Sequence, residues 1–177
     1  MTEFMDLIEK RQSVRNYSDK DIEKEKLIKC IEAARLAPSA CNAQPWHFHL
    51  VIDKEKVEKV SEYVQDKVMN KFASKSKAFV IVTEERGKVI SRFGGAIKNQ
   101  DYRSVDIGIA TEHICLEAAE MGIGTCIMGW FNEKKIKNLL NIPFSKRVRL
   151  VISFGYDNKG ILRKKIRKPL EEILDII

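Results

Sequence analysis

The sequence has no apolar run long enough to cross a bilayer, and its first residues are too charged and amphipathic for a secretory signal peptide. It also has no C-x-x-C pair, which argues against zinc, iron–sulfur and thioredoxin-like sites. Reduced thiols in a cytoplasmic protein are the simplest account of its four cysteines. We therefore expect a cytoplasmic protein that has no membrane partner. The cysteines are Cys30, Cys41, Cys115 and Cys126.

Nothing in the composition indicates disorder. The chain has 177 residues, of which 44% are apolar, and this predicts one domain over residues 1–177 with a sizeable core. Positive charge is unevenly placed, because Glu133–Lys168 holds twelve Lys or Arg against two Asp or Glu in a chain of net charge +7. Such a segment is typical of contact with nucleic acid, a membrane face or a phosphorylated small molecule. A solvated basic face accounts for most of these lysines.

The segment Pro38–Phe48 reads PSACNAQPWHF and lies between a helical pattern and a strand pattern. Between its two prolines, Ser39, Asn42 and Gln44 carry uncharged hydrogen-bonding side chains. Each proline disfavours helical backbone at the preceding residue, so an ordered, extended turn is predicted. Amide and hydroxyl groups held on such a turn suit a flat polar ligand, such as an isoalloxazine ring. The alternative is a rigid connector whose side chains bond only its own backbone.

Four other blocks accompany this segment along the chain. They are RQSVR at Arg11–Arg15, DIGIA at Asp106–Ala110, GIGTCIMG at Gly122–Gly129 and KIRKPLEEI at Lys165–Ile173. Together with PSxxNxQPWxF, they make nearly the whole chain similar to the nitroreductase family of FMN-dependent oxidoreductases. The resemblance implies an α+β, nitroreductase-like fold with a central, mainly antiparallel sheet flanked by helices. It also implies an intertwined homodimer in which the C-terminal tail is exchanged and adds a strand to the partner's sheet.

The resemblance places two FMN sites at the homodimer interface. Arg11 and Ser13 are expected to hold the phosphate and ribityl chain, and Arg15 to lie near flavin N1 and O2, where negative charge collects on reduction. Gln12 stands where many family members have a basic residue, so whether it contacts the cofactor is left open. From the residues alone, the alternative is that Arg11 and Arg15 only complement a helix C-terminus.

Other parts of the chain complete this expected cofactor site. Lys165 and Arg167, two residues apart on one face of an extended tail, are expected to finish the phosphate site. Backbone N–H groups near Met128 and Gly129 are expected to point at flavin N5, the atom that accepts and delivers hydride. The partner chain is expected to supply Pro38, Ser39, Ala40, Asn42 and, as a weaker candidate, Gln44.

Periodic apolar patterns predict the helices and strands around this site. The expected helices are Glu3–Lys10, Ile22–Leu36, one marked by Val57, Val60, Val64 and Val68, the apolar and buried Ser104–Met121 with Gly122 as its C-cap, and one with Asn132 as its N-cap. The expected strands are Phe48–Ile52, Ala78–Val82 (buried on both faces), Gly124–Gly129 and Val148–Phe154.

Some polar residues carry both a structural and a functional interpretation. Asp106 and His113, on the apolar helix, are expected to be hydrogen-bonded interior or interface groups rather than catalysts. His47 and His49 alternate with apolar neighbours, and we expect them to face solvent or a polar crevice rather than bind metal. The irregular segment Glu84–Tyr102 is interpreted either as a substrate lid or as an ordinary surface connection.

The leading functional hypothesis is an enzyme that moves hydride from NAD(P)H through FMN to a nitroaromatic, quinone or similar acceptor in a ping-pong cycle. The flavin carries the chemistry, so no catalytic side chain and no metal are required. One alternative is other flavin chemistry on the same fold, namely dehalogenation, enone reduction or flavin breakdown; another is a non-catalytic FMN-binding protein. A nucleic-acid-binding module ranks last, because no aromatic-interleaved basic strand or recognition helix accompanies the charge. The sequence names neither the physiological acceptor nor the preferred nicotinamide.

Overall fold

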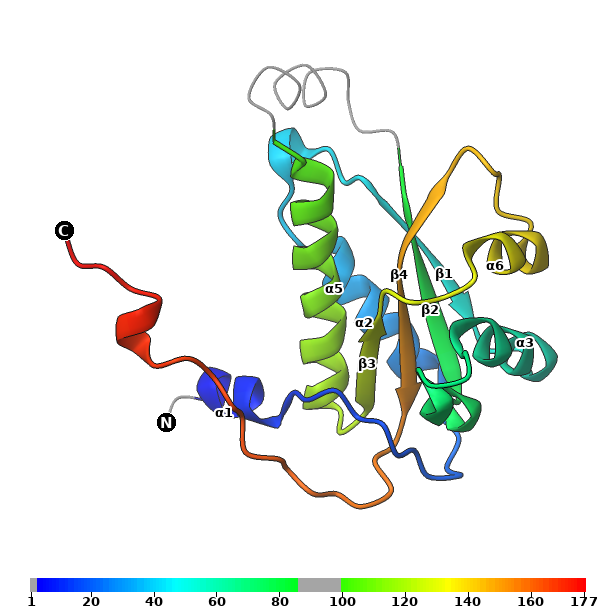
Figure 1. The fold of residues 1–177 in the computed structure, drawn as a ribbon, viewed down its shortest axis with the longest axis horizontal. Coiled ribbons are helices and arrows are strands. Elements are labelled where there is room, and N and C mark those ends of the chain that lie inside the picture. The colour runs from blue at the N-terminus through cyan, green and yellow to red at the C-terminus, as the bar shows by residue number, and fades with distance from the viewer. Residues whose placement is uncertain (1–2, 86–99) are drawn as a thin grey trace.

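In the computed structural model, which describes residues 3–85 and 100–177, one antiparallel sheet has the strand order β1-β2-β4-β3 (Figure 1). Every neighbouring pair of these strands is antiparallel, and helices lie on both faces. The predicted α+β class is therefore confirmed. The strands are β1 (Trp46–Val51), β2 (Ala78–Glu84), β3 (Gly124–Met128) and β4 (Arg147–Gly155).

The central strand β2 is buried on both faces, as its continuous apolar run predicted. Ala78, Val80 and Val82 join the core on one side of the sheet, whereas Phe79 and Ile81 join the core on the other side. None of the five is more than 1% exposed. Successive side chains of a strand point to opposite faces, so an interior strand between two helical layers needs apolar residues at every position.

Among the described residues, two helices cover each face of the sheet, and a fifth packs against one of these helices (Figure 1). Core residues from α2 (Lys24–Arg35) and α5 (Tyr102–Glu120) pack on one face, and those from α3 (Lys54–Val64) and α6 (Glu133–Leu140) on the other. The short helix α1 (Glu3–Lys10) contacts α5. Asn132 caps α6 by accepting a hydrogen bond from the Lys135 N–H, which confirms the predicted N-cap.

The helix α3 is shorter than the valine spacing predicted. It ends at Val64, and Val68 lies beyond it with 81% of its surface exposed. The cause is Asp66, whose Oδ1 accepts hydrogen bonds from the N–H groups of Val68 and Met69 and holds the backbone in a turn. Including Val68 in the helix was therefore wrong, because an aspartate competed locally for the same N–H groups.

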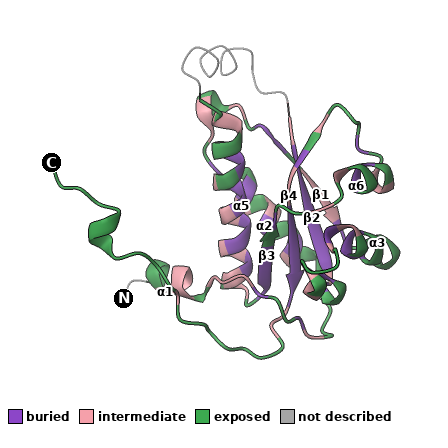
Figure 2. Ribbon diagram, viewed as in Figure 1, coloured by how far each residue is buried: buried purple, intermediate pink, exposed green. Residues whose placement is uncertain are grey.

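The long helix α5 is buried on one face only, although its sequence is apolar almost all round (Figure 2). Ile107, Ala110 and Ile114 face the sheet and α2 and are at most 2% exposed. Val105 is 57% exposed. The predicted buried helix is therefore confirmed for the face that packs on the sheet and α2. The family resemblance also implies that this helix forms much of the dimer interface, and that part stays a prediction. Gly122 ends this segment with φ of +71°, as expected of a helix C-cap.

Between α1 and α2 the chain crosses the paired ends of β3 and β4. The Val14 N–H donates to the Thr125 carbonyl over 2.8 Å, and Ser13 bridges Thr125 in parallel. Two glycines opposite each other, Gly124 and Gly155, allow this close approach. A Cβ on Gly124 would lie 2.6 Å from Val14, and one on Gly155 would lie 2.5 Å from the Tyr17 ring. The crossing sets the places of Arg11, Ser13 and Arg15.

The C-terminal tail leaves the domain and stays almost entirely exposed (Figures 1 and 2). From Gly160 to Ile177 every residue is exposed except the half-buried Lys165, and the only helical turn is Leu170–Glu172. An apolar segment of this length needs another surface to cover it. The exposed apolar side chains are Ile161, Leu162, Ile166, Leu170, Ile173, Leu174, Ile176 and Ile177.

The predicted lid, Glu84–Tyr102, includes residues 86–99, which lie outside the described residues. The two ends of that segment are joined by ion pairs. Arg149 Nε lies 2.5 Å from Glu84 Oε2, and Arg103 pairs with the other oxygen of the same carboxylate. Glu84 is only 10% exposed, so these contacts tie the start of α5 to the ends of β2 and β4.

Candidate cofactor site

Cations from opposite ends of the sequence meet at the end of α1. Lys165 Nζ donates a hydrogen bond to the Arg11 carbonyl over 2.5 Å. Partial burial lowers the pKa of Lys165, and the positive charges of Arg11 and Arg167 lower it further, while Glu9 and Glu112 act in the opposite direction. Positively charged side chains that lie close enough to repel one another stabilise an anion bound between them. The structure therefore brings together Arg11 and Lys165, two of the residues predicted to hold a phosphate, and Arg167 follows in the exposed tail.

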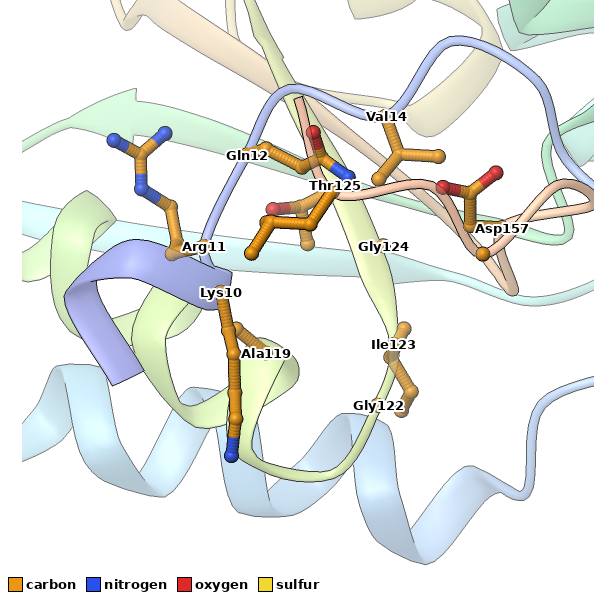
Figure 3. Close-up of a pocket in the computed structure, with 12 residues that line it drawn as sticks. Lys10, Arg11, Gln12, Val14, Ala119, Gly122, Ile123, Gly124, Thr125 and Asp157 are labelled. Carbon is orange, nitrogen blue, oxygen red and sulfur yellow. The ribbon is translucent and has the colours of Figure 1, made fainter. Parts of the chain in front are cut away.

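The Arg11 guanidinium retains hydrogen-bonding capacity. Its Nε lies 3.1 Å from Glu112 Oε1, yet the N–H is not aligned with that oxygen. The nitrogen is buried and has no hydrogen-bond partner among residues 3–85 and 100–177. Figure 3 shows the guanidinium turned away from the side chains that line the neighbouring cavity. A buried donor without a partner fits a site completed by an acceptor from outside, such as a phosphate oxygen.

Ser13 and Arg15 lie beside β3. Burial raises the pKa of the Cys126 thiol, whereas hydrogen bonds with Arg15 and Ser13 lower it. The side chains of Ser13 and Arg15 therefore lie close to that thiol. Arg11, Ser13 and Arg15 occupy alternate positions, so an extended segment directs them to one side. The intervening Val14 points to the other side and is buried against Gly124.

Gln12 contacts the tail with both ends of its amide. Its Nε2 donates to the Ile161 carbonyl over 2.9 Å. Its Oε1 accepts hydrogen bonds from the backbone N–H of Arg163 at 3.2 Å and from Arg163 Nε at 3.1 Å. These bonds leave the amide little capacity for a cofactor, so the described contacts give the predicted Gln12 cofactor contact no support.

The loop between the two prolines is a tight turn rather than the predicted extended segment. Ala40–Asn42 forms one 3-10 turn, and the Ser39 hydroxyl accepts a hydrogen bond from the Gln44 N–H over 3.0 Å. These local bonds override the extended bias that proline imposes on its neighbour. Three residues without glycine's freedom take left-handed backbone: Cys41 at φ 52°, Asn42 at 48° and Gln44 at 47°. Such residues cost about 1–3 kcal/mol each and cluster at ligand sites.

The two amides of this loop bond each other. Gln44 Nε2 donates to Asn42 Oδ1 over 2.9 Å, and both residues are exposed. This bond is what the rigid-connector interpretation expected. The Asn42 amide nitrogen and the Gln44 amide oxygen remain for a ligand, so the described contacts are compatible with either role.

Asp106 anchors the loop to α5. Both of its carboxylate oxygens accept from the Ala40 N–H, at 3.1 and 3.2 Å, and the residue is 4% exposed. His113 Nδ1 lies 2.9 Å from the Ile109 carbonyl. Both residues are thus hydrogen-bonded groups of the helix, as predicted. Asp106 holds the strained loop at the N-terminal part of α5.

Asp106→Ala is expected to lower the melting temperature by about 2–10 °C, because it leaves a half-buried N–H unpaired at a cost of about 1–3 kcal/mol. Asp106→Asn keeps one acceptor and should lose less. Thr111→Val on the same helix is the matched control, because the buried Thr111 hydroxyl has no hydrogen-bond partner in the described part of the chain. Calorimetry of the three variants compares them. Equal losses for Asp106→Ala and Thr111→Val would contradict the anchoring role.

The anchored loop and the cation cluster lie toward opposite ends of α5 within one chain (Figure 1). Asp106 binds the loop near the start of the helix, whereas Arg11 faces Glu112 and shares a cavity lining with Ala119 near its end. One chain alone therefore does not bring the two predicted halves of the site together.

Met128 and Gly129 end the strand that carries Thr125. Met128 is 3% exposed, while Gly129 is exposed and a Cβ built on it would meet nothing within 4 Å. Open space beside this backbone leaves room for a ligand, as the predicted contact to flavin N5 requires.

The histidines of β1 have a structural role. His47 is exposed and His49 is half-buried, with His49 Nε2 lying 3.2 Å from the Thr83 hydroxyl. Burial, aided by the charge of His47, lowers the pKa of His49 to about 4, so it stays neutral at physiological pH. Within residues 3–85 and 100–177, no group of three His, Cys, Asp or Glu side chains is placed to hold a metal ion.

Two residues of the site were missed from the sequence. Arg163 lies two positions before Lys165, so the same period-2 pattern that selected Lys165 and Arg167 would have found it. Glu112, whose carboxylate lies beside Arg11, carried no local signal. The ion-pair partner of an acidic residue on a helix surface is known only once the packing of the helices is known.

The fold is that of a nitroreductase-like α+β protein, and comparisons with known proteins agree. A model described as the nitroreductase family matches residues 8–156, so the chain belongs to that family. A relative from Archaeoglobus fulgidus, named provisionally as an NADH dehydrogenase/NAD(P)H nitroreductase, is 36% identical over 160 residues, or 88% of this chain and 86% of the relative. Family membership supports an NAD(P)H-dependent oxidoreductase, as the motifs predicted.

Solved structures show the same fold. The nitroreductase family protein of Streptococcus pneumoniae TIGR4 superposes with a TM-score of 0.84 at 25% identity, covering 99% of this chain and 100% of that one. An FMN-dependent nitroreductase of Clostridium difficile R20291 gives 0.72 at 28% identity, covering 96% and 94%. The predicted nitroreductase-like fold is therefore confirmed.

Proposed function

We propose that the chain is an FMN-dependent oxidoreductase that passes hydride from NAD(P)H to a nitroaromatic, quinone or similar small acceptor. The observation that carries this proposal is the hydrogen bond from Lys165 Nζ to the Arg11 carbonyl, beside a buried Arg11 Nε that has no hydrogen-bond partner among the described residues. A phosphate supplies both the negative charge and the acceptor oxygens that this arrangement favours. The name of the Clostridium difficile neighbour supports FMN as the phosphate-bearing group.

The residues of this chain would bind and tune the cofactor. Arg11, Ser13, Lys165 and Arg167 would hold the phosphate, and Arg15 would place a fixed positive charge near the ring. The loop that Asp106 anchors would offer amide groups to the ring edge. When bound, FMN supplies the hydride transfer, so the protein needs no side chain acting as acid, base or nucleophile.

We propose further that two chains complete each site, with the tail exchanged between them. The outer edge of β1 has no strand partner among the described residues, whereas β3 is bridged on its outer side by Ser13. An added strand would therefore find its place along Trp46–Val51. The exposed apolar residues of the tail would be buried by that exchange.

The basic C-terminal segment gives little support to nucleic-acid binding. Lys137 pairs with Glu133, Lys146 with Glu85 and Arg149 with Glu84, each at 2.5 Å. These three cations are neutralised locally, and most of the other cations in the segment are exposed, as expected of a solvated basic face. None of the described helices is long and apolar enough to cross a membrane.

The test is a visible absorption spectrum of the purified protein before and after anaerobic addition of NADH or NADPH. We expect a flavin spectrum that bleaches with at least one donor and returns when a nitroaromatic or quinone is added. A flavin that neither donor bleaches would instead identify a non-catalytic FMN protein. A colourless protein that takes up no added FMN would refute the proposal.

A further inference from the structure

The tail stands away from the domain where it first passes α1. A cavity of about 250 Å³ separates the two, lined on the domain side by Val14, Ile123 and Gly124 and on the tail side by Gly160 and Leu162 (Figure 3). Apolar packing therefore does not seat the tail here. Whatever fixes its position must act across the cavity.

Hydrogen bonds from two side chains span this gap. Gln12 Nε2 donates to the Ile161 carbonyl, and Gln12 Oε1 accepts from the backbone N–H and the Nε of Arg163. The Arg163 guanidinium in turn donates to the Ser13 carbonyl. We call Gln12 and Arg163 the tail clasp. It joins residues 151 positions apart in the sequence.

The residue type of Gln12 suits this role. A single side chain must donate to a carbonyl and accept from an N–H and a guanidinium, and an amide does both. A basic side chain, which the family resemblance leads one to expect at this position, has no acceptor for Arg163 and would repel it. With an amide instead of a cation at position 12, this side chain can bind the tail rather than the phosphate.

We propose that Gln12 is a positioning residue that sets the register of the tail and so places Lys165 beside Arg11 and turns Arg167 to the same side as Lys165. In an extended chain, residues 163, 165 and 167 share one face, and a slip of one residue would turn their side chains to the opposite face. Fixing Ile161 and Arg163 therefore fixes the two cations that follow. This inference rests on the proposed function for the identity of the anion.

The decisive comparison is between FMN and riboflavin, which differ only by the phosphate. In Gln12→Leu, the affinity for FMN should fall about tenfold or more, the loss of roughly one charge-assisted hydrogen bond, while riboflavin binds as before. Gln12→Glu, which still accepts from Arg163, should recover part of that loss. Lys164→Leu, which removes a neighbouring exposed cation, is the control. Fluorescence titration gives all the dissociation constants.

A second readout needs no flavin. In cofactor-free protein, trypsin should cut the tail after Lys164, Lys165 and Arg167 severalfold faster in Gln12→Leu than in the wild type, as followed by mass spectrometry. A direct contact between Gln12 and phosphate would leave this rate unchanged. Unchanged cleavage overturns the clasp, and an equal loss of FMN and riboflavin affinity overturns its role at the phosphate. Wild-type protein that binds neither flavin refutes the proposed function, whereas the cleavage rates still test the clasp.

Discussion

Arg167→Ala and Arg11→Ala are each expected to weaken FMN binding by about 10- to 100-fold while the protein stays folded. Each removes one charge-assisted contact to the phosphate, worth about 1.5–3 kcal/mol. Arg167 is exposed and, within residues 3–85 and 100–177, bonds only the carbonyl of Ile166, its neighbour in the tail, so its loss should not disturb the core. Arg11 is partly exposed, and its carboxylate neighbour Glu112 can turn to solvent.

Fluorescence titration with FMN and with riboflavin measures the effect of both substitutions, and size-exclusion chromatography reports whether the assembly persists. Riboflavin, which lacks the phosphate, should bind both variants as it binds the wild type. Lys168→Ala is the matched control, because it removes an adjacent exposed cation that no described contact places at the site. Raising the salt concentration should weaken FMN binding to the wild type more than to either variant. FMN affinity unchanged in both arginine variants would refute the phosphate assignment.

The sequence predicted the sheet and its helical layers because those elements carry their own signals. The run from Ala78 to Val82 has no polar residue, and only a strand covered on both faces needs such a run. The α5 pattern was harder to interpret. A helix that is apolar all round looks buried all round, yet one of its faces is exposed in the single chain, where Val105 lies open. The composition of a helix does not distinguish an apolar face that is buried within its own chain from one that a second chain would cover.

The errors came from bonds that act locally against a pattern. Valine spacing alone extended α3 to Val68, but the Asp66 carboxylate took the N–H groups that the next turn of helix would have used. The loop before β1 likewise folded back, because Ser39 and Gln44 bond across it. Both signals are short polar side chains beside a predicted boundary, which favour turns over regular structure.

The cation cluster was predictable only in part. The alternation of Lys165 and Arg167 is visible in the sequence, and so is that of Arg11, Ser13 and Arg15. The contacts that fix them are not, because Gln12 and Arg163 meet only after the chain has folded. The strain at Cys41, Asn42 and Gln44 was equally invisible, since none of the three is a glycine. The family resemblance pointed to Arg11, Lys165 and Arg167, and the fold shows that Gln12 and Arg163 tie the tail to the same segment.

Mixed dimers test whether two chains build each site. One chain would carry Arg11→Ala and Arg167→Ala, which remove the phosphate contacts. The other would carry Asn42→Asp, which replaces the remaining amide donor of the loop by a carboxylate while keeping side-chain size and the acceptor for Gln44 Nε2, and Asp still tolerates the left-handed backbone at position 42. Each variant alone should lose FMN, because every site in a homodimer then carries the same damage.

The mixed dimer should regain about one FMN per dimer, because twofold symmetry places both sets of substitutions in one site and leaves the other site intact. Co-expression with two different affinity tags and sequential purification isolates the mixed species, and its absorbance gives the flavin content. The separation of the loop from the cation cluster along α5 is the reason for this expectation. If the cofactor were held within a single chain, each protomer of the mixed dimer would keep its own defect. No FMN would then be recovered, and the composite site would be refuted.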